Sequence, residues 1–138
     1  MPALVTSASV EECLRKCLVS RGYTLNRVRG YGETGVDVEA RRGAEIVAIE
    51  VIVFKSSPPA RAKDFYEAFF RAVSRLNGGA THCVIALPNR FGQGLPARAG
   101  PHRVAWNRIG TAFPELQIWL VNPGADSYET STWCSWLG

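Results

Sequence analysis

The sequence predicts an α/β domain in which helices flank a single mixed central sheet. Two apolar stretches, 44–54 and 81–87, have the β-branched composition of strands that are buried on both faces. Between them, the apolar residues of 58–76 recur at helical spacing. Over the whole chain, the predicted order is helix, three strands, helix, strand, helix and strand.

The first helix is predicted to begin at Ser9-Val-Glu-Glu12, which has the spacing of a capping box, and to end at Gly22. At about 100° per residue, Glu11 lies on the shoulder of the apolar stripe of this helix, whereas Glu12 points away from it. We therefore expect Glu12 in solvent and Glu11 as the acid that can face inward.

A strand from Tyr23 to Gly30 should follow, and it leads into Gly30-Tyr-Gly-Glu-Thr-Gly35, a match to G-x-G-x-x-G. A dinucleotide site would need a helix directly after the third glycine. Residues 36–41 instead alternate as a second strand does. We interpret the glycine-rich stretch as a turn between two strands.

The third strand, 44–54, carries a charged residue, Glu50, in its apolar centre. A tight turn at Arg42-Gly43 joins it to the second strand, and such a hairpin can bring Asp37 and Glu50 together. Burying a carboxylate without a partner costs several kcal/mol. Glu50 is therefore expected to be ion-paired, to bind a metal, to stay protonated or to open onto a cleft.

The second half of the chain has clear boundaries. Ser57-Pro58-Pro59 supplies an N-cap and a first-turn proline to the second helix, and Asn77-Gly-Gly ends it. Residues 88–100 predict a loop, 101–113 a third helix and 116–121 a last strand.

Length and pattern predict one domain over residues 1–138, with a core at about 7–122 and an irregular tail at 123–138. Trp133 and Trp136 lie in that tail. Exposed tryptophans of this kind pack back on the body or against a second subunit, so we also expect a possible homodimer through the tail.

Composition adds modest constraints. The net charge of +4 comes from 13 Arg and 3 Lys, which permits a nucleic-acid partner. No stretch reaches the about 18 apolar residues of a membrane span, and no signal peptide is evident. The four cysteines lack the spacing of a disulfide framework or of a zinc site. We therefore expect a cytoplasmic protein with buried thiols and no membrane association.

The arrangement of acids resembles that of the PD-(D/E)xK nuclease superfamily, which has the restriction-endonuclease-like fold and includes Holliday-junction resolvases. Glu11 lies in the first helix, Asp37 follows the turn, and Glu50 lies thirteen residues further on in an apolar-Glu-apolar pattern. The likeness spans Val10 to about Leu87. It implies a DNA phosphodiesterase in which Asp37 and Glu50 hold Mg²⁺ or Mn²⁺ and Glu11 assists.

The chain departs from that pattern at Ile52, where the family has a lysine that orients the attacking water or the phosphate. The resemblance implies that Lys63, at the start of the next helix, takes this role if the lysine has moved. If the lysine is lost, the domain is an inactive nuclease-fold module that binds nucleic acid or a protein partner. Arg61, Arg90 and Arg98 are the candidate nucleic-acid contacts.

Structural interpretations of the same residues stay open. In one interpretation, Asp37 is an ordinary strand-end residue that bonds the glycine-rich turn. In another, Glu50 forms a structural ion pair with Arg41 or Arg61. Tyr66 and Phe70 are expected in the core rather than as platforms on which bases stack.

Overall fold

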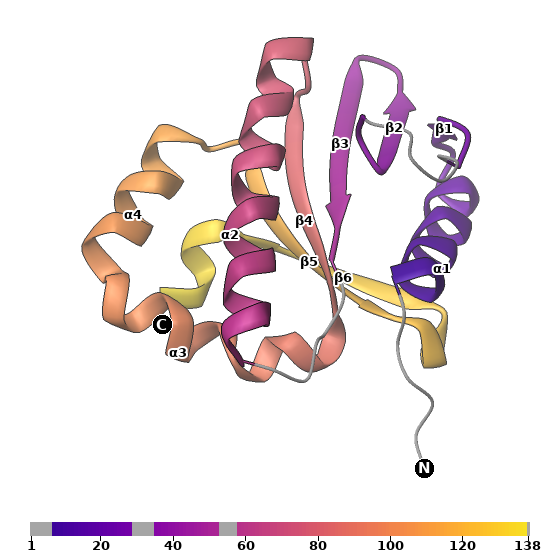
Figure 1. Cartoon of the computed structure of the whole chain (residues 1–138). Coiled ribbons are helices and arrows are strands. Elements are labelled where there is room, and N and C mark those ends of the chain that lie inside the picture. The colour runs from indigo at the N-terminus through magenta and orange to yellow at the C-terminus, as the bar shows by residue number, and fades with distance from the viewer. Residues whose placement is uncertain (1–6, 29–34, 53–57, 138) are drawn as a thin grey trace.

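The computed structural model describes residues 7–28, 35–52 and 58–137, which form a six-stranded mixed sheet with helices on both faces (Figure 1). In chain order, the elements are α1 (Ser7–Ser20), β1 (Thr24–Leu25), β2 (Val38–Arg42), β3 (Glu45–Val51), α2 (Pro58–Ser74), η1 (Arg75–Gly78), β4 (His82–Pro88), η2 (Asn89–Gln93), α3 (Leu95–Ala99), η3 (Gly100–His102), α4 (Arg103–Ala112), β5 (Leu116–Asn122), η4 (Pro123–Ala125), β6 (Ser127–Thr132) and η5 (Trp133–Leu137). The predicted α/β class with a single mixed sheet is confirmed.

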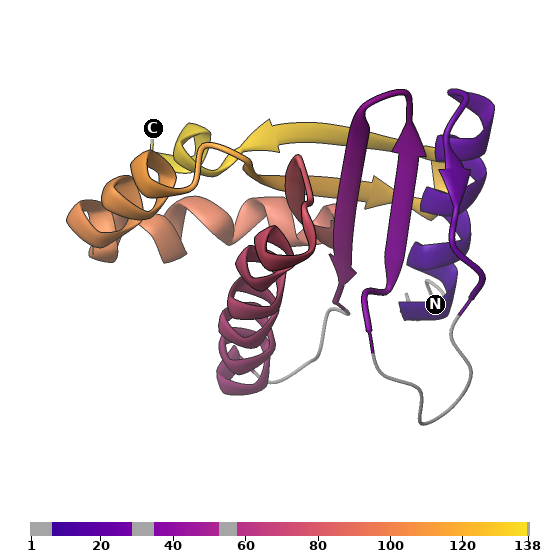
Figure 2. The same ribbon diagram turned by 90° about the horizontal axis from the view of Figure 1, so that it is seen from above.

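The strands lie in the sheet in the same order as in the chain, from β1 to β6. The pairs β1–β2, β2–β3 and β5–β6 are antiparallel, whereas β3–β4 and β4–β5 are parallel. Helix α2 makes the crossover between β3 and β4, and α4 makes the crossover between β4 and β5. Figure 2 shows β5 and β6 crossing steeply over the direction of β2 and β3, as accumulated strand twist requires.

Strand β3 divides the core because its side chains alternate between the two faces of the sheet. Val47 and Ile49 belong to a cluster with Val10, Leu14 and other apolar residues of α1. Ile52, of the opposite parity, belongs to a second cluster under α2. The side chain of Glu50 shares the parity of Ile52 and therefore faces α2.

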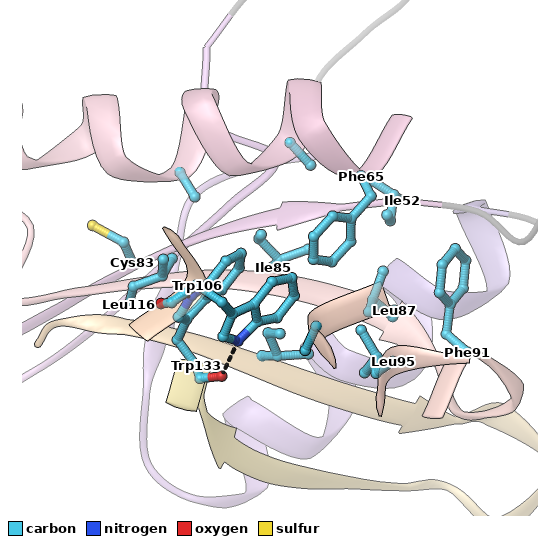
Figure 3. Packing of buried hydrophobic residues seen from close by; sticks show 14 residues of the cluster. Ile52, Phe65, Cys83, Ile85, Leu87, Phe91, Leu95, Trp106, Leu116 and Trp133 are labelled. Atoms are coloured by element: carbon cyan, nitrogen blue, oxygen red, sulfur yellow. Dashed lines mark hydrogen bonds between the residues drawn. The ribbon is translucent and has the colours of Figure 1, made fainter. Parts of the chain in front are cut away.

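The cluster under α2 is organised around Phe65, which is fully buried (Figure 3). Its ring stacks with the rings of Trp106 and Trp133 at centroid distances of 6.0 and 5.9 Å. The two indoles stack on each other at 4.0 Å, and each donates its Nε1–H to the backbone carbonyl of the other, at 2.7 and 2.8 Å. These contacts join α2, α4 and η5 into one layer.

Two predicted boundaries are confirmed by backbone geometry. Gly43 has φ +60° in the tight turn between β2 and β3, and Gly79 has φ +88° where η1 ends. The first strand is shorter than predicted within the described residues, since only Thr24 and Leu25 pair with β2. Most of the glycine-rich stretch, residues 30–34, lies outside the described residues, and β2 follows it.

The irregular tail predicted at 123–138 is wrong, and so is the loop predicted at 88–100. The first contains β6 and η5, and the second contains η2 and α3. Strand β6 was missed because its sequence, Ser-Tyr-Glu-Thr-Ser-Thr, is polar, as suits an edge strand of which Tyr128 alone is buried. Trp133 of η5 packs back on the body of its own chain.

All four cysteines are free thiols. Cys13 and Cys83 are buried, and burial raises the pKa of each thiol to about 11. Within the described parts of the chain, no helix combines the length and the apolar character that crossing a membrane requires.

Gly110 tests whether η5 is an integral part of the fold. A Cβ atom at this position of α4 would overlap Sγ of Cys134 and lie 3.2 Å from Cδ1 of Trp133. Gly110→Ala should therefore lower the free energy of unfolding by about 1–2 kcal/mol, because overpacking outweighs the gain in helix propensity. Urea denaturation measures the loss.

Two further variants make that test specific. Gly110→Ala combined with Cys134→Ala should recover part of the loss, because the overlapping sulfur is gone. Asn107→Ala, at an exposed position of the same helix, should leave the stability nearly unchanged. A stabilising effect of Gly110→Ala alone would contradict the observed packing of η5 against α4.

Candidate functional site

Glu50 lies near the carboxyl end of β3, between β2 and β4, on the face that α2 covers. It is 3% exposed and is the one buried charged residue among the described residues. The residues around Glu50 are apolar because both faces of this central strand are covered by other parts of the fold. The buried acid that the sequence singles out is therefore buried in the structure as well.

The partner of Glu50 is Arg75, the first residue of η1, directly after α2. Its Nε–H and Nη2–H both donate to one carboxylate oxygen, Oε1 of Glu50, at 3.0 and 2.7 Å. The Arg75 side chain is 30% exposed, so its guanidinium joins the interior to the surface. A charge-assisted fork of this kind is among the strong hydrogen bonds of proteins.

Asp37 is the second acid of the site and directly precedes β2. Because Val38 pairs with Ile49, the antiparallel register brings Asp37 opposite Glu50. Its Oδ2 accepts the backbone N–H of Val51 at 2.9 Å, one residue beyond Glu50. The predicted meeting of Asp37 and Glu50 is thus present. The Asp37 carboxylate bonds the neighbouring strand at Val51.

These surroundings raise the pKa of Glu50 above its ordinary value of 4.5. Burial is the main cause, since desolvation disfavours the charged form. The hydrogen bonds from Arg75 act in the opposite direction, and the negative charge of Asp37 raises the pKa further. Arg75 supplies the positive charge that offsets the buried Glu50 carboxylate.

The site differs from the nuclease pattern at the position of the missing lysine. Ile52 is 8% exposed and belongs to the cluster that contains Phe65. Its side chain fills the core and cannot donate a proton or a hydrogen bond. Lys63 is 76% exposed, and its Nζ lies 3.9 Å from Oε1 of Glu67 on the same helix. The described contacts of Lys63 are therefore with α2 itself.

Glu11 lies on α1, the helix that covers the opposite face of the sheet. It is half-buried and Glu12 is exposed, as predicted. Its Oε2 accepts from Nε of Arg15 at 2.8 Å, and Nη2 of Arg15 donates to the backbone carbonyl of Asp37 at 2.9 Å. Arg15 thus links Glu11 to the backbone of the site.

The predicted nucleic-acid contacts are scattered over the fold. The side chain of Arg61 lies outside the described residues. Arg90 is exposed in η2. Arg98 is half-buried in α3, where its guanidinium lies over the rings of Phe65 and Tyr66 at 5.4 and 5.9 Å.

The remaining charges near the site pair locally. Arg41, a candidate partner of Glu50, instead bonds Glu39 two residues earlier on β2, with Nε to Oε1 at 2.6 Å. A hollow of about 380 Å³ lies beside the site, and its walls include Glu39, Ser74, Arg75 and Asn77. Arg75 therefore bonds Glu50 through Nε and Nη2 and also lines the hollow.

A divalent cation fits this arrangement poorly. A hard cation needs several oxygen ligands, and each of the two carboxylates already has an oxygen engaged, by Arg75 or by the Val51 amide. No group of three or more potential His, Cys, Asp or Glu ligands occurs in the described parts of the chain. The guanidinium already supplies positive charge where a cation would have to bind.

Little in the sequence indicates Arg75 as the partner of Glu50. It follows Glu50 by 25 residues and lies at the end of a helix, where basic residues are common for other reasons. One available signal is the position of Arg75 at the end of the helix that follows β3. A crossover helix packs against the sheet, so its last residues lie close to the strand that precedes it. The guanidinium is long enough to reach Glu50 from there.

Comparison with known proteins supports the fold. The structure is similar to the crystal structure of an XisH family protein from Nostoc punctiforme, with a TM-score of 0.60 and 14% sequence identity over 88% of this chain and 96% of that chain. No protein-family model and no curated protein sequence matches the chain. At this identity, the likeness concerns the fold alone.

Replacing Arg75 tests whether the site is held together by its ion pair. Arg75→Met should lower the free energy of unfolding by about 2–4 kcal/mol, because it leaves the Glu50 carboxylate buried beside Asp37 without a counter-charge. Urea denaturation measures this. The control is Arg71→Met, which removes an exposed i, i+4 pair with Glu67 and should cost less than about 0.5 kcal/mol.

The loss in Arg75→Met should also depend on pH. A hydrogen bond that lowers the pKa of Glu50 is removed, so this pKa rises further above 4.5. The folded protein then holds the Glu50 proton more tightly than the unfolded chain does. The free energy of unfolding therefore falls as the pH rises from 4.5 through the raised pKa of Glu50. The loss should be larger near pH 8 than near pH 5. Equal losses at both pH values would contradict the role assigned to Arg75.

Proposed function

We propose that this chain is a non-catalytic domain with a nuclease-like fold that works by binding a protein partner. The observation that carries the proposal is the pairing of Glu50 with Arg75, whose two N–H groups meet the carboxylate where the resemblance implies a metal. An ion pair in this place stabilises the hairpin of β2 and β3 against α2. It engages Oε1 of Glu50, an oxygen that a metal ion would need.

The residue at position 52 supports the same conclusion. The resemblance implies a lysine beside the scissile phosphate, and Ile52 is instead part of the core with Phe65. A lysine could not replace it without burying an ammonium group among apolar side chains. The surroundings of this position are therefore adapted to an apolar residue, and Lys63 points into solvent.

The second candidate is the metal-dependent DNA phosphodiesterase that the resemblance implies. The observation in its favour is that Asp37 lies opposite Glu50 across the β2–β3 hairpin. This function requires Arg75 to leave Oε1 of Glu50, after which Mg²⁺ or Mn²⁺ would be held by Asp37 and Glu50. Glu11 and Lys63 would assist, and Arg61, Arg90 and Arg98 would contact DNA.

Metal binding and cleavage distinguish the two functions. We expect calorimetric titration with Mn²⁺ to show no saturable binding at micromolar concentrations, and supercoiled plasmid to stay intact with either Mg²⁺ or Mn²⁺, because Arg75 occupies Oε1. Glu50→Gln should keep the protein folded, since the amide oxygen still accepts from Arg75.

The opposite outcome is equally specific. Mn²⁺ binding that Glu50→Gln abolishes, together with nicking that Asp37→Ala abolishes, would establish the phosphodiesterase. Glu45→Gln is the matched control, because it removes the same charge from the start of the same strand, where Glu45 pairs with Arg42. Its metal binding and cleavage should equal those of the unaltered protein in either case.

A further inference from the structure

A groove of about 390 Å³ lies between α2 and α4, away from the Glu50 site. It is lined by Tyr66, Phe69, His102, Trp106, Ile109 and Trp133, together with Ala105. Its volume is in the range of sites that bind ligands, and its walls are almost wholly apolar. Six of these seven side chains bring no charge.

The floor of the groove is rigid. The indoles of Trp106 and Trp133 stack (Figure 3) and exchange two hydrogen bonds. The Phe69 ring lies 5.4 Å from that of Trp133. These ring contacts and hydrogen bonds hold the aromatic side chains in place, so the side chains do not fold over to fill the groove. The groove is therefore formed before any partner arrives.

Apolar side chains continue from the groove onto the surface. Phe70 is 70% exposed and Tyr66 is 46% exposed, contrary to the prediction that both lie in the core. Apolar side chains left in water around an apolar groove are typical of an interaction surface.

The charges around the groove are mostly positive. Arg98 lies over Tyr66 at one end, and its buried Nε has no hydrogen-bond partner within the described structure. Lys63 is exposed and precedes the lining residue Tyr66 by three positions on α2. Arg108 is exposed and follows the lining residue Ala105 by three positions on α4. Residues three apart are neighbours on a helix surface. None of the described residues that line the groove is a carboxylate. Glu67, on the side of α2 that carries Lys63, pairs with Lys63 and Arg71.

We propose that this groove binds an amphipathic helix of a partner protein, with apolar residues on one face and carboxylates on its flanks. The apolar face would cover Trp106, Trp133 and Phe70, and a carboxylate would meet Arg98. A helix laid in a groove between two helices is an established way to recognise such a segment. The inference rests on the proposed binding function and specifies its surface.

Charge decides between the possible occupants. A second copy of this chain would place the same basic rim against itself, which costs free energy. A nucleic acid would need several phosphate contacts, whereas the groove wall offers tryptophan, phenylalanine and isoleucine. An acidic amphipathic helix satisfies both the apolar floor and the basic rim.

The test uses a designed helical peptide of about 15 residues with leucine and phenylalanine at i, i+3, i+4 and i+7 spacing and glutamates on the flanks. A second peptide has lysine at each glutamate position, and a single-stranded oligonucleotide is the third probe. Binding to the full chain is followed by tryptophan fluorescence, since Trp106 and Trp133 form the floor. Light scattering reports the oligomeric state.

We expect the acidic peptide to bind and the basic peptide to bind at least about tenfold more weakly. Ala105→Glu, at an exposed lining position, should weaken the acidic peptide at least about tenfold. Asn107→Glu adds the same charge two residues away, on a different side of α4, and should change binding less than about twofold. Circular dichroism confirms that both variants fold.

Several outcomes would overturn the proposal. These are equal binding of the two peptides, no binding of the acidic peptide, and equal effects of the two α4 variants. Displacement of the peptide by the oligonucleotide would assign the groove to nucleic acid. A dimer that Ala105→Glu converts to monomers would assign it to a second copy. None of these results depends on metal binding or cleavage, so failure of the groove and failure of the proposed function stay distinguishable.

Discussion

The contact between Arg75 and Glu50 is the constraint on which the arrangement of β2, β3 and α2 depends. An acid in the middle of a strand that is covered on both faces is tolerated only with a counter-charge. The guanidinium supplies it from the far end of the crossover helix, and Asp37 bonds the strand one residue beyond. Helix, hairpin and site are thus fixed relative to one another by a few polar groups in an otherwise apolar core.

This arrangement gives both acids of the β2–β3 hairpin a role in holding the fold together. Asp37 accepts a hydrogen bond from the backbone N–H of Val51, and Glu50 accepts from Arg75. Both acids therefore stabilise the fold without a bound metal. Ile52 then completes the core where a lysine would have needed polar surroundings. Exposed aromatic residues lie elsewhere, on α2 beside the groove that faces α4.

Much of this could be predicted from the sequence. The apolar run around Glu50 and the stripe of α2 predict a central strand and a crossover helix, because long, strongly patterned segments bury what their pattern indicates. The meeting of Asp37 with Glu50 follows from hairpin parity. The partner could not be predicted, because Arg75 reaches Glu50 only through the tertiary path of α2. Strand β6 and the exposure of Phe70 were missed for a related reason: one is a polar edge strand and the other an apolar residue on the outer face of its helix.

The stacked indoles of Trp106 and Trp133 have a consequence for synthesis of the chain on the ribosome. Trp133 supplies one wall of the cluster around Phe65, and it follows Phe65 by 68 residues in the chain. The layer of α2 and α4 can therefore reach its final packing only when η5 has left the exit tunnel. Until then, the face of Phe65 that Trp133 later covers is open to chaperones.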